Sequence, residues 1–143
     1  MVTLVKMRIM LVDDEERFLE TTQKLLAKRG YEAVTATGGV ECLEKLAQEL
    51  VHVVILDVKM PDMDGVETLK RIKQRFPLVE VIMLTGHATT ESAVEGMKSG
   101  ATDYLVKPTD IDVLIAKAEE AFKKRRDLED KIRMAEALKK SSI

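Results

Sequence analysis

The sequence contains a single cysteine, no tryptophan and no long run of apolar residues. Because Cys42 is alone, an intrachain disulfide and a metal site built from thiolates are excluded, and a reducing cytoplasm is the expected location. No apolar stretch reaches the ~18 residues that a membrane span requires. Residues 1–6 hold too short an apolar run for a signal peptide. We therefore expect neither membrane insertion nor secretion.

An excess of charge of one sign is also missing. Lys and Arg number 23 and Asp and Glu number 25, which gives a net charge of −2. This balance offers no electrostatic reason for direct binding to nucleic acid. Hydrophobic residues make up 45% and charged residues 34%, which is typical of a folded chain and not of a disordered one. The length of 143 residues fits one domain with a core of its own.

Short apolar segments alternate with amphipathic segments along the chain. The apolar runs are mostly β-branched and lack polar alternation, which indicates parallel strands buried on both faces. Short strands that alternate with helices predict a parallel α/β sheet, covered by helices on both faces through right-handed crossovers. The expected strands are residues 7–12, 31–36, 53–56, 80–84 and 102–106, and the expected helices are 16–29, 40–50, 66–76, 90–98 and a last one from 111 onward.

Polar residues follow four of the five expected strands. Asp13 and Asp14 come after the first strand, Asp57 after the third, Thr85 after the fourth and Lys107 after the fifth. In open parallel sheets, ligands bind outside the carboxyl ends of the strands. Since these ends share one edge of the sheet, we expect the five side chains to face a common site.

Three carboxylates at one edge repel one another unless a cation lies among them. Oxygen ligands without imidazole or thiolate suit a hard divalent ion, and Mg²⁺ is the usual choice near phosphate. A carboxylate beside Mg²⁺ can attack a phosphoryl donor, and a lysine and a threonine hydroxyl can stabilise the developing charge. Taken singly, each residue has a plainer interpretation, such as a turn cap or a solvated lysine. Together they predict phosphoryl transfer to a carboxylate.

Four motifs in this order resemble the receiver domain of two-component response regulators. They are Leu-Val-Asp-Asp-Glu at 11–15, Asp-Val-Lys-Met-Pro-Asp-Met-Asp-Gly at 57–65, Leu-Thr-Gly at 84–86 and Tyr-Leu-Val-Lys-Pro at 104–108. The resemblance covers roughly residues 7–124 and implies a flavodoxin-like, doubly wound sheet of strand order 2-1-3-4-5. It further implies a CheY-like signalling phosphoprotein whose own catalysis is limited to self-phosphorylation and self-dephosphorylation.

The resemblance assigns roles to the residues at the sheet edge. Asp57 would be the phosphoacceptor for a sensor histidine kinase or a phosphotransfer protein. Asp14, Asp57 and the backbone carbonyl of Lys59 would bind Mg²⁺ directly, and Asp13 would act through water. In this family the second position after the acceptor aspartate and the second after the threonine tune the lifetime of the phosphoryl group. We therefore hypothesise that Lys59 and His87 tune dephosphorylation here.

Three further residues carry the signal in the family. Lys107 would contact the phosphoryl group, with a cis bond to Pro108. Thr85 and Tyr104 would form the switch pair, in which the hydroxyl turns toward the phosphoryl group and the ring moves from exposed to buried. The resulting change would alter the surface formed by the fourth helix, the fifth strand and the fifth helix.

Residues 125–143 form a charged tail that lacks Gly and Pro. Leu128, Ile132, Ala135 and Leu138 keep a helical spacing, so we expect the last helix to continue through the tail as an extension of a receiver domain at 1–124. One interpretation is a solvated helix that frays. The other is a helix that pairs two protomers, so that a homodimer forms through this tail and the surface of the fourth helix, fifth strand and fifth helix. Similar receivers precede ATPase modules in transcription activators, and the downstream effector here is open.

Two rival functions meet obstacles in the sequence. A phosphatase of the dehalogenase type needs an Asp-x-Asp motif at its first strand, which Asp13-Asp14-Glu15 does not provide. Nucleotide hydrolysis would need a Gly-x-x-x-x-Gly-Lys loop, which is absent from the sequence. A third alternative is a degenerate receiver that only binds partner proteins, independently of phosphorylation. Such a receiver would be expected to lose an acidic residue, the threonine or the lysine, and this chain keeps all of them.

Overall fold

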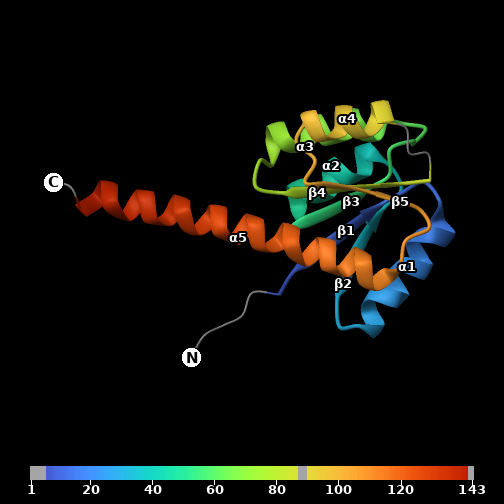
Figure 1. The fold of residues 1–143 in the computed structure, drawn as a ribbon, viewed down its shortest axis with the longest axis horizontal. Coiled ribbons are helices and arrows are strands. Elements are labelled where there is room, and N and C mark those ends of the chain that lie inside the picture. The colour runs from blue at the N-terminus through green and yellow to red at the C-terminus, as the bar shows by residue number, and fades with distance from the viewer. Residues whose placement is uncertain (1–5, 87–89, 142–143) are drawn as a thin grey trace.

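The structure, a computed structural model, describes residues 6–86 and 90–141. Strands and helices alternate along the chain, and one helix projects far beyond the body of the domain (Figure 1). In chain order the elements are β1 (Arg8–Val12), α1 (Glu16–Lys28), β2 (Glu32–Ala36), α2 (Gly39–Gln48), β3 (Val53–Leu56), α3 (Gly65–Arg75), β4 (Glu80–Thr85), α4 (Thr90–Lys98), β5 (Asp103–Val106) and α5 (Ile111–Ser141).

The five strands form one parallel sheet in the order β2-β1-β3-β4-β5. This is the strand order that the family resemblance implied. Strand β3 lies at the centre, where Ile55 pairs with Leu11 on one side and Ile82 on the other. All four residues of β3 are buried, as its unbroken apolar sequence predicts. The predicted fold class is therefore confirmed.

Successive strand residues point to opposite faces and build two separate cores. Helices α2, α3 and α4 cover one face, and α1 and α5 cover the other (Figure 1). The first core is formed by alternate strand residues, Met10, Val54 and Leu56 among them, together with apolar residues of α2 and α3. The second is formed by the intervening residues, such as Leu11 and Ile55, with those of α1 and α5.

Helix α4 differs from the amphipathic helix that its sequence suggests. Val94 and Met97 are exposed, whereas Gly96 is buried. A Cβ atom added at Gly96 would lie 3.6 Å from Met83, so the glycine lets the helix lie close to β4. The side chains of Val94 and Met97 therefore point away from the sheet and are accessible to a partner.

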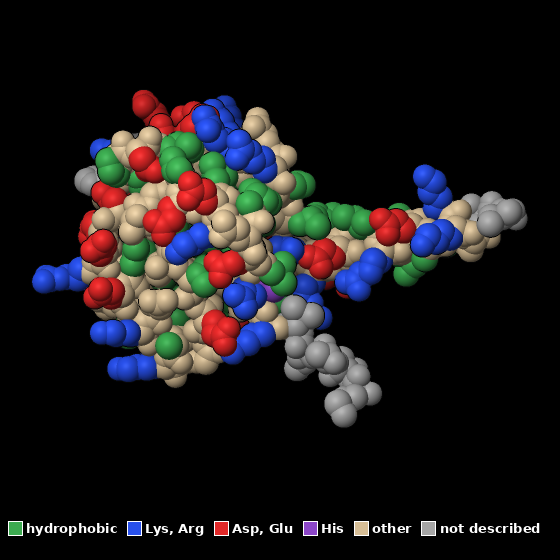
Figure 2. Space-filling view, turned by 180° about the vertical axis from the view of Figure 1, so that it is seen from behind, with side chains coloured by type: hydrophobic (Ala, Val, Ile, Leu, Met, Phe, Trp, Pro, Cys, Tyr) green, Lys and Arg blue, Asp and Glu red, His purple; other side chains and the backbone are tan. Residues whose placement is uncertain are grey.

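Helix α5 is much longer than the body that it covers. Its 31 residues span about 46 Å at the usual rise per residue. The guanidinium of Arg125 marks the last anchored turn, since it donates to the Val51 carbonyl (2.8 Å) and to Glu129 (2.6 Å). Beyond it the helix projects into solvent (Figures 1 and 2). The long terminal helix is confirmed, and it runs without interruption across the predicted division between residues 124 and 125.

The amino edge of the sheet carries a second polar cluster. His52 is buried there, accepts a hydrogen bond at Nδ1 from the Arg8 backbone N–H (2.9 Å), and lies 4.9 Å from the Phe122 ring. Burial and the nearby Arg125 lower the pKa of His52, so the neutral ring is favoured. This cluster supports the sheet at the end opposite to the predicted site. Across the described ranges, no helix combines the length and the apolar character that crossing a membrane demands.

Candidate functional site at the carboxyl edge of the sheet

Backbone hydrogen bonds extend the sheet by one residue at three strand ends. The Asp13 N–H donates to Ala36 (3.1 Å) and the Asp57 N–H donates to Val12 (2.9 Å). The Lys107 N–H donates to Thr85 (2.8 Å). These three predicted site residues are thus fixed by the strands beside them, and residues far apart in sequence converge at one edge.

The structure brings the three predicted carboxylates together. Carboxylate oxygens of Asp13, Asp14 and Asp57 lie within 4.8 Å of one another. Asp13 and Asp57 are buried, whereas Asp14 is exposed. The cluster is therefore open to solvent on the Asp14 side and closed on the side of the sheet.

The loop after β3 approaches Asp57 so closely that only glycine fits at position 65. The Gly65 N–H donates to the Val58 carbonyl at 2.6 Å. A Cβ atom on Gly65 would lie 2.3 Å from the Asp57 carbonyl oxygen and 2.6 Å from the Val58 Cα. Both neighbours are backbone atoms, which cannot turn aside as a flexible side chain can. Gly65 thus allows α3 to begin directly against Asp57.

Lys107 reaches across the site from β5. Its ammonium forms an ion pair with Asp13 at 2.5 Å and lies 4.0 Å from the centre of the Phe18 ring. The Lys107 side chain is only 16% exposed, so this pair is shielded from bulk water. The Lys107–Pro108 peptide bond is cis, as the family resemblance implied.

Several effects act on the Asp57 carboxyl, and the net effect raises its pKa above the ordinary value. Burial is the largest cause and the negative charge of Asp13 the next. The ammonium of Lys107 and hydrogen bonds from the Thr85 side chain and the Val58 backbone act in the opposite direction. Asp57 is therefore a carboxylate whose charge is not fully compensated by the protein alone.

The two predicted switch residues lie on neighbouring strands. Thr85 is completely buried, and its side chain is hydrogen-bonded to Asp57. Tyr104 is half-buried against the first core, and its hydroxyl lies 3.0 Å from the Ser92 hydroxyl of α4. The Tyr104 hydroxyl therefore links β5 to α4 next to the site.

The donor set fits a hard divalent cation. Three clustered carboxylates and one ammonium leave two negative charges uncompensated among these four groups. The ligand atoms that the described residues bring to the cluster are all oxygens, which Mg²⁺ and Ca²⁺ prefer. The charge of Asp13 contributes to this excess and is also, after burial, the second cause of the raised pKa of Asp57.

The two predicted tuning residues are not tested by the geometry. The Lys59 side chain is exposed at the start of the loop after β3. His87 falls outside the described residues. Their roles remain predictions.

Asp62 caps a helix from a distance, a role that sequence reasoning missed. Its carboxylate accepts hydrogen bonds from the backbone N–H groups of Gly39 (3.3 Å) and Val40 (3.1 Å) at the start of α2. A Cβ atom on Gly38 would lie 2.6 Å from this carboxylate, so a larger residue there would displace it. Asp62 thereby ties the loop after Asp57 to α2. The adjacent glycines Gly38 and Gly39 at the start of α2 were the available signal in the sequence. They indicate that another group approaches the backbone closely, but they do not identify Asp62 as that group.

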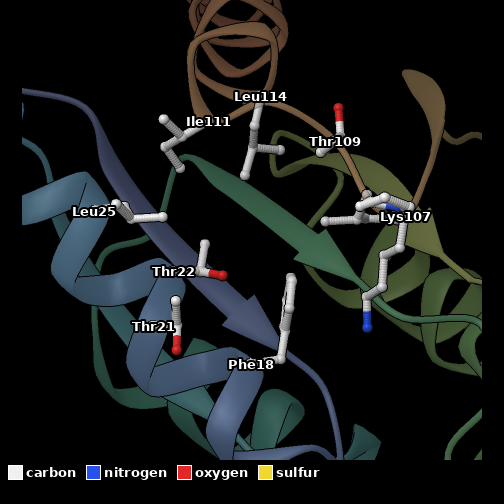
Figure 3. A pocket seen from close by; sticks show the side chains of 10 residues that line it. Phe18, Thr21, Thr22, Leu25, Lys107, Thr109, Ile111 and Leu114 are labelled. Atoms are coloured by element: carbon white, nitrogen blue, oxygen red, sulfur yellow. The ribbon is translucent and has the colours of Figure 1, made fainter.

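A cavity of about 430 Å³ lies beside the site, between α1 and the start of α5. Figure 3 shows Phe18, Thr22 and Leu25 of α1 on one side, Ile111 and Leu114 of α5 on the other, and the side chain of Lys107 beside the Phe18 ring. Phe18 and Leu25 of α1 are apolar but only half-buried, because they line this cavity.

Comparisons with known proteins agree with the geometry. A transcriptional regulatory protein, ZraR of Klebsiella oxytoca, is 40% identical over 114 residues, which are 80% of this chain but only 26% of that protein. The chain thus spans about a quarter of the length of this curated relative. The crystal structure of a CheY-like receiver domain protein from Methanospirillum hungatei JF-1 is 32% identical, with a TM-score of 0.82, and covers 86% of this chain and 98% of its own.

A second solved structure is the beryllofluoride-activated NtrC4 receiver domain dimer, determined in solution. It is 35% identical, with a TM-score of 0.77, and covers 82% of this chain and 98% of its own. The family model of the response regulator receiver domain matches residues 9–119, from the first strand into the last helix. Because that match includes the whole carboxyl edge of the sheet, this chain belongs to the family of receiver domains of two-component response regulators.

Proposed function

We propose that Asp57 accepts a phosphoryl group from a sensor histidine kinase or a phosphotransfer protein, and that this modification switches the domain. The observation that carries the proposal is the convergence of Asp57, two further carboxylates and the Lys107 ammonium at one sheet edge. Three carboxylates with a single cation are costly to assemble unless the site uses them. In a receiver domain, binding of a cation and transfer of a phosphoryl group would use these carboxylates.

In the proposed reaction an Asp57 carboxylate oxygen attacks the phosphorus of the donor. A phosphorus–oxygen bond to Asp57 forms, and the bond to the donor breaks. With a phosphohistidine donor the electron pair stays on the imidazole nitrogen, and with acetyl phosphate it leaves on acetate. Lys107 and the Thr85 hydroxyl stand beside Asp57 and can donate to the phosphoryl oxygens, where negative charge accumulates.

Asp13, Asp14, Asp57 and the backbone carbonyl of Lys59 are the residues that would hold Mg²⁺. When bound, the ion would offset the repulsion between the carboxylates and the incoming phosphoryl group. The ion pair between Lys107 and Asp13 gives Lys107 a position from which it can move to the phosphoryl group. Lys59 and His87, which flank the opening in the family pattern, would set how fast water removes the phosphoryl group.

The proposed output is a change of the surface formed by α4, β5 and α5. Thr85 would turn toward the phosphoryl group, and Tyr104 would exchange its contact with Ser92 for a more buried position. Apolar side chains are exposed on all three of these elements, so the surface has room for a partner. They are Val94 and Met97 of α4, Val106 of β5 and Val113 of α5.

We propose that this partner is a second copy of the chain. The exposed apolar residues of the α5 extension, such as Leu128 and Ile132, favour pairing of two helices, and Figure 2 shows hydrophobic side chains along the projecting helix. The similar NtrC4 receiver domain is a dimer in its activated form, and ZraR is named a transcriptional regulatory protein. The proposal extends to a cytoplasmic regulator of transcription.

The deciding experiment is incubation with Mg²⁺ and acetyl phosphate, followed by intact-mass measurement. We expect a gain of one phosphoryl group in the unmodified protein and none in Asp57→Ala, or when a chelator removes the ion. Modification that persists in Asp57→Ala would assign the acceptor elsewhere. Absence of any modification would leave a domain of receiver fold that binds partners independently of phosphorylation.

A further inference from the structure

We infer that the aromatic ring of Phe18 is a positioning residue for the Lys107 ammonium, and thereby sets the rate at which Asp57 is phosphorylated. The inference rests on the proposed function, because it concerns the same reaction. It adds a residue that belongs to none of the four receiver motifs in this sequence.

The Lys107 ammonium is held from two sides. Its Nζ lies 4.0 Å from the centre of the Phe18 ring, well inside the range of a cation–π interaction. The same ammonium lies 2.5 Å from Asp13. The ring and the carboxylate together hold the ammonium beside the carboxylate cluster, although the lysine stem alone is flexible.

The Lys107 side chain is largely shielded from bulk water, since only 16% of it is exposed. The face of an aromatic ring carries partial negative charge and replaces part of the hydration of an ammonium without adding a competing hydrogen-bond acceptor. When Lys107 leaves Asp13 for the phosphoryl group, the ring is the contact that can remain.

Core packing accounts for only part of the position of Phe18, whose ring lies against the second core but is not enclosed by it. The side chain is half-buried and borders the cavity of about 430 Å³ between α1 and α5, as Figure 3 shows. Core residues of the same helix, Leu19 and Leu26, are fully enclosed instead. A residue placed only to fill the core would not leave an open space behind its ring.

The test separates the charge distribution of the ring from its shape. Phe18 is replaced by mono-, di- and trifluorophenylalanine, which keep the ring while they progressively weaken its negative face. The rate of phosphorylation by acetyl phosphate with Mg²⁺ is then measured by intact mass. We expect the rate to fall stepwise with each fluorine, by about two- to tenfold across the series, and to be retained in Phe18→Trp.

The same fluorination at Phe76 is the matched control. Phe76 is also half-buried, but it packs on the opposite face of the sheet, so its series should leave the rate unchanged. Equal rates across the Phe18 series, or a rise with fluorination, would overturn the inference while leaving Asp57 as the acceptor. Failure of the unmodified protein to gain a phosphoryl group would overturn the proposed function and this inference together.

Discussion

At the scale of one residue, the buried carboxylate of Asp57 lowers the stability of the folded protein when it is ionised. Burial and the charge of Asp13 raise the pKa of its carboxyl, so the folded protein holds the proton more tightly than the unfolded chain does. The ionised form therefore costs stability, and this cost appears as the pH rises through the raised pKa. Below the ordinary pKa of an aspartate the cost is absent.

Replacing Asp57 with asparagine should therefore stabilise the metal-free protein at neutral pH. We expect a gain of about 1 kcal/mol in the free energy of unfolding by urea. The gain should shrink as the pH falls through the pKa of Asp57, since the proton then removes the charge in the unmodified protein as well. Asp127→Asn, on an exposed residue of α5, is the control and should change little. A metal-free Asp57→Asn protein less stable than its parent would contradict the electrostatic account.

Gly65 is the residue whose replacement by alanine should be costly. Because the new Cβ would meet the backbone of Asp57 and Val58, we expect a loss of about 2 kcal/mol or more in unfolding free energy. Gly86→Ala is the matched comparison, because among the described residues its nearest new contact is the Lys107 Cβ at 4.0 Å. Thermal unfolding of the two variants tests the difference, and equal melting temperatures would show that the loop can relax.

At the scale of elements, the start of α2 depends on a residue outside the helix. Gly38, the capping position of α2, has no side chain to accept a hydrogen bond, and Asp62 supplies the acceptor from the loop after β3. Helix α3 is capped in the ordinary way, by Asp64 at its own first turn (2.8 Å to the Glu67 N–H). One loop therefore caps two helices and couples them to the site.

Removal of the Asp62 carboxylate should loosen both the helix and the loop. We expect Asp62→Ala to lower the unfolding free energy by about 1 kcal/mol, and Asp62→Asn to lose less because an amide oxygen still accepts. Partial burial acts to raise the pKa of Asp62, but the backbone hydrogen bonds together outweigh it and the net pKa is lowered. The stabilisation is therefore complete above the ordinary aspartate pKa and is lost as the pH falls through the lowered value. If Asp62→Ala melts like its parent at neutral pH, the cap contributes nothing.

At the scale of the whole molecule, α5 has two parts with different surroundings. Its first part packs on the sheet through Leu114, Ala118 and Phe122, and Arg125 closes that contact. The part beyond is exposed, with Leu128 and Ile132 on the continuing stripe. A solvated helix of that length is marginal in water without a partner.

Association through this stripe should be sensitive to one charge. We expect Ile132→Asp to shift the protein toward the monomer in sedimentation experiments, while phosphorylation of Asp57 is unchanged. Val40→Asp is the matched control, because Val40 is also an exposed apolar residue of a helix but belongs to α2, outside both proposed surfaces. If both variants remain dimers, dimer formation is assigned to the α4-β5-α5 surface. If the unmodified protein and both variants are all monomers, dimer formation is excluded.

The parallel sheet, its helices, the residues at its carboxyl edge and the long last helix could all be predicted from the amino-acid sequence. These features have local causes, since an apolar run, a glycine or an acidic pair acts over a few neighbouring positions. The receiver motifs added the strand order and the expected role of each site residue.

Which distant side chains meet could be learned only from the folded chain. The contact of Phe18 with Lys107, the cap of Asp62 on α2 and the outward orientation of Val94 have no counterpart in local periodicity. Each depends on how two elements pack, and packing is settled by the shapes of all the side chains between them. Local sequence therefore specifies Asp57 and its edge of the sheet, whereas the packing of distant elements arranges the charges around that carboxylate.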